Sequence, residues 1–211
     1  MSVTPNVPMR PRPAVAFLDE SYDYTRDGSR EPLYVLAAVL IDGDGVATAR
    51  SATRQLIAPA TSYHSTELAR TGKINKVYEM LEHVRDEAGW SVVAVHSPFI
   101  GHADAARRAC LRALLIDLSS RKVGRVVLDS RCQPRARDPR TLDKQDLRVA
   151  RELRSAGLID RLLTITHAND ATEPLLWLPD GVAWSVRRAM VADDEQHFQI
   201  IRSVTRLIVV A

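Results

Sequence analysis

The amino-acid sequence predicts a mixed-sheet α/β domain, and three observations support this class. Two apolar segments of strand length lie close together near the N-terminus, separated by a polar stretch that suits a hairpin. Further apolar segments then alternate with segments of helical periodicity, an order typical of parallel strands joined by helical crossovers. The length of 211 residues, with 45% hydrophobic and 26% charged residues, fits one globular domain.

The first two strands are expected at residues 14–18 (AVAFL) and 32–41 (PLYVLAAVLI). Both segments are continuously apolar, as strands covered on both faces are. Residues 21–31 between them are polar and contain Gly28, which indicates a hairpin connection. Gly43 then closes the second strand.

The remaining segments alternate between helix and strand. Helices are expected where apolar residues recur every three or four positions, and Gly89 and Gly157 end two of them. The predicted helices cover residues 46–56, 73–88, 103–122, 142–156 and 175–190. The predicted strands cover residues 90–96, 125–128, 162–166 and 203–210.

The N-terminal residues 1–12 form a Pro-rich segment that we expect to be poorly ordered, so residues 13–211 make up the single domain. This segment lacks the apolar region of a signal peptide, and the longest apolar run, residues 34–41, is far shorter than the ~20 residues that span a bilayer. Cys110 and Cys132 lie in no CxxC or Cys/His cluster, which predicts free thiols. We therefore expect a cytoplasmic protein without a membrane partner.

Charge is unevenly distributed along the chain. The net charge is only +3, but residues 107–161 hold thirteen Arg and two Lys against seven acidic residues. Arginine suits phosphate because its guanidinium forms two parallel hydrogen bonds. A codon bias toward Arg explains part of the high Arg content. It does not explain why the basic residues are concentrated in residues 107–161 while the rest of the chain is acidic. The small net charge is therefore compatible with a polyanionic partner.

Three acidic residues lie where α/β folds place functional groups, and Glu67 is a fourth candidate. Asp19 and Asp129 each directly follow a predicted strand, Asp180 lies near the start of the last helix, and Glu67 lies in the segment YHSTEL. Four carboxylates in one site repel one another unless cations compensate them. Mg²⁺ or Mn²⁺ suits this task because hard ions prefer oxygen ligands, and two such ions promote phosphodiester hydrolysis.

Each acid also has a structural alternative. Asp19 or Asp129 can cap the loop after its strand, and Asp180 or Glu67 can be favoured by the positive end of a helix dipole. Only the joint pattern predicts a metal site. Other phosphate chemistries fit poorly, because the sequence has no P-loop and no G-x-G-x-x-G after a strand.

Five short motifs, in order FLDES, YVLAAVL, HSTEL, VVLDSR and LLWLPDGVAW, resemble the DUF3800 family, a bacterial group with an RNase H-like fold. The resemblance spans residues 14–190 and implies a mixed β-sheet flanked by helices, with a two-metal nuclease site. It implies that the catalytic and metal-binding residues are Asp19, Glu67, Asp129 and Asp180. Glu20 is an auxiliary candidate. The chain departs from the family fold in an additional helix before HSTEL and in the third antiparallel strand, which has no obvious counterpart.

Several other residues have possible supporting roles. His64 is a candidate for proton transfer or phosphate contact and Lys73 for substrate contact, although both suit a solvated position equally. A basic loop after Asp129 is a candidate for binding nucleic acid, with a solvated loop or a surface for an acidic protein as alternatives. This loop contains Arg131, Arg135, Arg137 and Arg140. Trp177 and Trp184 are seven residues apart and are expected to pack in the core.

The leading hypothesis is a Mg²⁺- or Mn²⁺-dependent nuclease that hydrolyses DNA or RNA with two ions. Its setting would be phage defence, a toxin system or mobile DNA, with a homodimer or a protein partner as further expectations. The alternative is a non-catalytic module that retains the RNase H-like fold and uses its basic face to bind nucleic acid or a protein.

Overall fold

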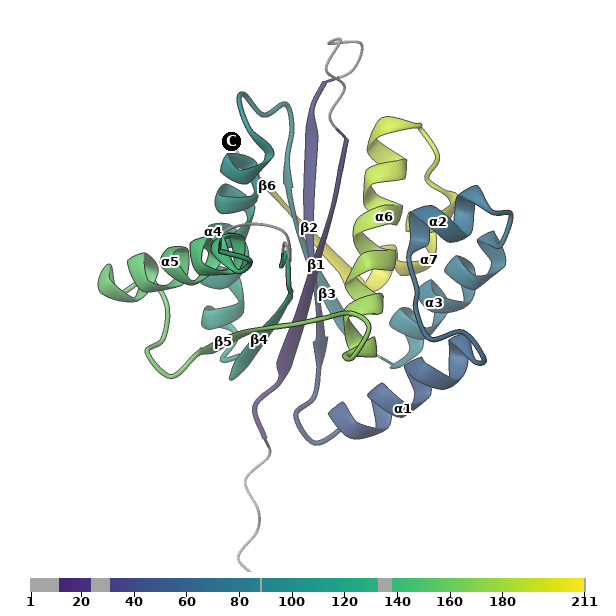
Figure 1. Cartoon of the computed structure of the whole chain (residues 1–211), viewed down its shortest axis with the longest axis horizontal. Helices are drawn as coiled ribbons and strands as arrows, with labels where there is room; N and C mark the ends of the chain where they lie inside the picture. The colour runs from purple at the N-terminus through teal and green to yellow at the C-terminus, as the bar shows by residue number, and fades with distance from the viewer. Residues whose placement is uncertain (1–11, 24–30, 88, 133–137, 211) are drawn as a thin grey trace, which may run out of the picture.

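The computed structural model describes residues 12–23, 31–87, 89–132 and 138–210. Six strands form one sheet in the order β5-β4-β1-β2-β3-β6, with helices on both faces (Figure 1). The strands are β1 (Val15–Asp23), β2 (Leu33–Ile41), β3 (Trp90–His96), β4 (Arg125–Asp129), β5 (Thr164–Ala168) and β6 (Thr205–Val210). Among them, β2 runs opposite to the other five. The predicted α/β class with a mixed sheet is confirmed.

The helices divide between the two faces of the sheet. The helices are α1 (Val46–Ile57), α2 (Ser65–Arg70), α3 (Ile74–Glu87), α4 (Ala103–Ser120), α5 (Thr141–Ser155), α6 (Trp177–Val191) and α7 (Gln196–Ile201). Figure 1 shows α4 and α5 on one face and the other five on the opposite face. Gly89 and Gly157, both with φ of 69°, follow α3 and α5 as predicted, because glycine adopts this left-handed conformation without strain. The short helices α2 and α7 were not predicted.

Two hydrophobic clusters fill the two sides of the sheet. Alternate residues of β1 point to opposite faces, so Phe17 belongs to the cluster on the α6 side, whereas Leu18 belongs to the cluster on the α4 side. Trp177 and Trp184 belong to the α6 side and are each 2% exposed, which confirms their core position. The same alternation continues past the apolar part of β1 and decides on which face each following polar side chain lies.

The structure corrects the strand boundaries that the sequence predicts. β1 does not end at Leu18 but continues to Asp23, because β2 pairs with it along its whole length. β3 is antiparallel to β2. It is the third antiparallel strand of the family fold, for which the sequence shows no obvious counterpart. β5 begins two residues later than predicted, at Thr164, and ends at Ala168.

The predicted Pro-rich segment lies almost wholly outside the described residues, whereas both cysteines are described. Arg12 is the one residue of the predicted Pro-rich segment 1–12 that the structure describes. Cys110 is buried and Cys132 is exposed, and both are free thiols. None of the described helices is long and apolar enough to cross a membrane.

Candidate functional site

Four carboxylates gather at one end of the sheet, on its α6 side. Asp19 and Asp129 lie next to each other, because the parallel pairing of β1 with β4 ends one residue earlier at Leu18 and Leu128. Asp180 lies in the first turn of α6, and Asp170 follows β5 by two residues. We call Asp19, Asp129, Asp170 and Asp180 the acid face. Neighbouring strands lie roughly 4.8 Å apart, so the two strand carboxylates are close in space.

Two carboxylates of the acid face, Asp19 and Asp129, have raised pKa values. Burial, together with the charges of Glu20, Asp180 and Asp129, raises the pKa of Asp19 well above its usual value. Burial and the charges of Asp170 and Glu20 raise the pKa of Asp129 to about 7. Both effects disfavour the ionised form, as expected for like charges that share a poorly solvated site.

Asp180 is fixed in place by the start of α2. Its Oδ2 accepts hydrogen bonds from the backbone N–H of Ser65 at 2.8 Å and from the Ser65 hydroxyl at 2.7 Å. The Ser65 side chain is buried, and its hydroxyl also bonds to the hydroxyl of Tyr63 at 3.0 Å. Burial still raises the pKa of Asp180, although the bonds from Ser65 oppose this effect. The HSTEL motif therefore contributes a clamp on Asp180 through its serine.

Asp170 is the member of the acid face that the sequence analysis missed. Its Oδ2 lies 3.4 Å from His64 Nε2, and its side chain is 25% exposed. The rule that picked out Asp19 and Asp129, an acid just after a strand, applies equally to Asp170. The predicted end of that strand, residue 166, was too early to show this, since β5 continues to Ala168.

Glu20 is oriented toward the other face of the sheet. Its partner across the hairpin is Leu36, which packs on the α4 side, and its carboxylate forms an ion pair with the buried guanidinium of Arg107. Arg107 Nη2 also donates a hydrogen bond of 2.9 Å to Asp146 of α5, and Asp146 Oδ2 accepts one of 3.2 Å from His167 Nε2. We call Glu20, Arg107, Asp146 and His167 the paired face. Arg107, the first residue of the basic block, is thus 1% exposed and unable to guide a polynucleotide.

On the paired face, the pKa of Asp146 moves in the opposite direction. Burial alone would raise the pKa of Asp146, but bonds from His167 and Arg107 outweigh it and lower the pKa to about 2. Tyr34 closes this cluster, with its hydroxyl 3.4 Å from Arg107 Nη1. Charges of both signs are present here, so the Asp146 carboxylate remains ionised.

Glu67 lies on α2 with a side chain that is 57% exposed, and its Oε1 bonds to Arg70 at 2.9 Å. The structure therefore does not gather Glu67 with the buried carboxylates, and its role as a ligand stays a prediction. Lys73 is exposed at the turn before α3. His64 is the supporting candidate that the structure brings to the acid face.

The predicted basic loop is described at its two ends. Arg131 forms ion pairs with Asp104 at 2.8 Å and with Asp146 at 3.4 Å, so its guanidinium is already held by carboxylates. Arg140 is exposed beside a groove of about 630 Å³ between β5 and α5. The other two candidates of this loop, Arg135 and Arg137, lie outside the described residues.

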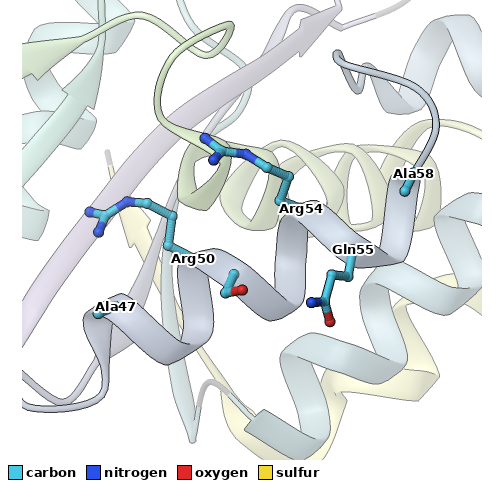
Figure 2. A pocket seen from close by; sticks show the side chains of 6 residues that line it. Ala47, Arg50, Arg54, Gln55 and Ala58 are labelled. Carbon is cyan, nitrogen blue, oxygen red and sulfur yellow. The ribbon is translucent and has the colours of Figure 1, made fainter.

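A second hollow, of about 380 Å³, lies along α1 (Figure 2). Figure 2 shows Arg50 and Arg54 extending from the same side of that helix, with Gln55 pointing away from them. Arg50 is held by Glu173 through a bond of 2.8 Å from Nη2 to Oε2. No acid-face residue lines this hollow, so it offers no metal site.

The donor chemistry of the acid face fits a hard divalent cation. Its donors are all oxygens, and the buried Oδ1 of Asp129 has no hydrogen-bond partner among the described residues. No three His, Cys, Asp or Glu side chains in the described ranges stand close enough to hold one ion by themselves. Mg²⁺ commonly binds to one or two carboxylates and takes its other ligands from water and substrate phosphate, so smaller ligand sets suffice.

The comparisons with known proteins concern the fold. The chain is similar in structure to the ribonuclease H2 from Pyrococcus horikoshii OT3, with a TM-score of 0.50 and 15% sequence identity over 85% of this chain and 74% of that chain. The fold is RNase H-like. This confirms the fold that the five motifs implied. No protein-family model and no curated protein matches the sequence.

Proposed function

We propose that this protein is a nuclease that hydrolyses phosphodiester bonds in DNA or RNA with Mg²⁺ or Mn²⁺. The observation that carries the proposal is the acid face, where carboxylates from β1, β4 and α6 have raised pKa values and one buried oxygen has no hydrogen-bond partner among the described residues. Structural cores compensate buried charges, as the paired face of this same molecule does. Similarity in fold to a protein named as a ribonuclease supports the same reaction class.

In this proposal Asp19, Asp129 and Asp180 hold the cations. When bound, two such ions activate a water molecule and stabilise the leaving oxygen of the phosphodiester. Ser65 keeps the Asp180 carboxylate oriented, and the backbone N–H of Glu20 holds Oδ1 of Asp19 at 2.7 Å. His64, which is 60% exposed and lies 3.4 Å from Asp170, is a supporting residue of the site in this proposal.

Membership of the DUF3800 family belongs to the same proposal, as do a role in phage defence or a toxin system and assembly with a second copy or a protein partner. The motifs quoted above support the family. The basic surface that would hold the nucleic acid begins at Arg140 in this proposal.

One experiment tests the metal and the activity together. Thermal unfolding is followed with and without Mg²⁺ or Mn²⁺, and cleavage of labelled RNA/DNA hybrid, single-stranded RNA and double-stranded DNA is followed on gels. A metal present at 100 times its Kd stabilises the fold by about 2.7 kcal/mol. We expect Asp129→Asn to remove both this stabilisation and the cleavage. The control is Glu152→Gln, since Glu152 is exposed on α5 and remote from the acid face.

The second candidate function is a binding module that has no catalytic activity. The observation that favours it is that no three ligating side chains in the described residues are already assembled around one point. This module would bind nucleic acid in a salt-dependent manner, with no response of its stability to Mg²⁺ or Mn²⁺. Metal-independent binding without cleavage of all three substrates would replace the nuclease proposal by this one.

A further inference from the structure

Arg187 of α6 lies beside the acid face and has no role in the site described so far. Its Nε donates a hydrogen bond of 2.8 Å to the hydroxyl of Ser21 on β1. Among the described residues, no carboxylate lies within ion-pair distance of its guanidinium. A half-buried cation is thus bonded to a neutral group.

The neighbouring residue shows what a fully paired arginine looks like here. Arg188 donates two hydrogen bonds to Asp194 Oδ2, at 2.6 and 2.9 Å, and lies over the ring of Trp184. Burial and the charge of Arg188 lower the pKa of Arg187, whereas the charges of Asp23 and Asp180 act in the opposite direction. The surroundings of Arg187 therefore disfavour its charged form, and a bound anion would offset this effect.

The position of Arg187 follows from two periodicities. Ser21 lies two residues after Asp19 on β1 and on the same face, which places it roughly 7 Å further along the strand. Arg187 lies seven residues after Asp180 on α6, or two helical turns. The guanidinium therefore occupies the place next to the acid face, in the direction in which β1 continues.

The chemistry of the group indicates its ligand. A guanidinium has five N–H donors, of which Ser21 takes one, so a fork of donors is left for a planar or tetrahedral oxyanion. A cluster of carboxylates repels a polyanion, and a cation at its border offsets this repulsion. A free carboxylate ligand fits less well. The acid face would repel it too, and the proposed phosphodiester hydrolysis would not act on it.

We infer that Arg187 binds a backbone phosphate of a nucleic-acid strand, one that flanks the phosphate held at the acid face. The inference rests on the proposed function for the identity of the ligand. Arg187 is then a substrate-binding residue, held ready by Ser21, and the nucleic acid runs along the end of β1 and α6.

The test measures binding of a fluorescein-labelled 20-base-pair RNA/DNA hybrid by anisotropy, in EDTA so that no metal supports cleavage, between 50 and 300 mM salt. Loss of one phosphate contact lowers the slope of log K against log salt by about 1. We expect Arg187→Gln to weaken binding roughly 5- to 30-fold and to lower the slope in this way. Arg188→Gln is the matched control, because its guanidinium is already paired, and we expect less than a 2-fold change.

Two further variants separate binding from a structural role. Arg187→Lys retains the charge but not the fork, so we expect intermediate affinity with the wild-type slope. Ser21→Ala removes the positioning bond and should weaken binding less than Arg187→Gln. If Arg187→Gln fails to fold, Arg187→Lys decides, and wild-type affinity in that variant overturns the inference.

The outcomes distinguish this inference from the proposed function. Wild-type affinity and slope in a folded Arg187→Gln overturn the inference, even where Mg²⁺-dependent cleavage is intact. Failure of the wild-type protein to bind the hybrid also overturns it. If Arg187→Gln shows the expected loss but the wild-type protein cleaves no substrate with Mg²⁺ or Mn²⁺, the phosphate contact is supported and the nuclease proposal fails.

Discussion

The acid face and the paired face lie at the same end of the sheet, on its opposite sides. They shift the pKa of a carboxylate in opposite directions. On the acid face the pKa of Asp129 is raised to about 7, whereas on the paired face the pKa of Asp146 is lowered to about 2. Asp146 is buried and Asp129 is partly buried. The difference is Arg107, which supplies a cation to one cluster and none to the other.

This contrast indicates which cluster maintains the fold and which one is available for chemistry. A compensated network contributes specificity and is damaged when one member is removed. An uncompensated cluster costs stability, and such perturbed groups concentrate at functional sites. One residue step along β1, from Asp19 to Glu20, separates the two roles.

The largest effect is expected where the paired face is broken. Arg107→Met removes the buried cation that pairs with both Glu20 and Asp146, which should destabilise the protein by about 3–5 kcal/mol. Thermal and urea unfolding measure this loss. Arg112→Met is the control on the same helix, because Arg112 is 42% exposed and its ion pair spans 3.9 Å. A loss in Arg107→Met no larger than in the control would contradict the structural role of the paired face.

Removing a charge from the acid face should act in the other direction. We expect Asp129→Asn to raise the free energy of unfolding at pH 8 by about 1–2 kcal/mol, a value reduced for solvent screening at a partly exposed site. The pKa of Asp129 is raised to about 7 in the folded state, so its cost is absent near pH 4 and complete above pH 7. Urea unfolding at pH 4, 6 and 8 checks this, and an equal effect at all three values would refute it.

The paired face should determine stability at acid pH. Because the pKa of Asp146 is lowered to about 2, its stabilisation is complete above the unfolded value near 4 and is lost as the pH falls toward 2. Asp146→Asn should therefore lower stability at pH 7 and show a shallower decline between pH 4 and 2. Circular dichroism during acid titration measures both, and parallel curves for variant and wild type would count against the assignment.

The smallest effects separate two candidates for the fourth acid. Glu67→Gln alters an exposed side chain and should change stability by less than about 0.5 kcal/mol. Asp170→Asn removes a charge that raises the pKa of Asp129, so we expect it to reduce the stabilisation by Mg²⁺ or Mn²⁺, whereas Glu67→Gln retains it. Thermal unfolding with added metal compares them. If Glu67→Gln loses the stabilisation by metal and Asp170→Asn retains it, Glu67 is the metal ligand that the family resemblance implies.

Sequence reasoning found most of the elements and three members of the acid face. Apolar runs and helical periodicity located every strand and the five longer helices, because burial imposes those patterns locally. α2 and α7 have six residues each, too few to show a periodicity. The strand ends were less accurate, since the polar half of β1 is held by its pairing with β2 rather than by its own composition.

By itself the sequence determined the α/β class, the order of strands and helices, and the acidic residues that follow two of the strands. These properties depend on neighbours within a few positions along the chain. Only the tertiary structure decided which partner each charged side chain meets: Glu20 with Arg107, Asp180 with Ser65, Asp170 with His64, and Arg187 with Ser21. The partners in these pairs are separated by 87, 115, 106 and 166 positions along the chain. Strand register and helix packing bring them together, so a sequence pattern that covers a few neighbouring residues does not show these contacts.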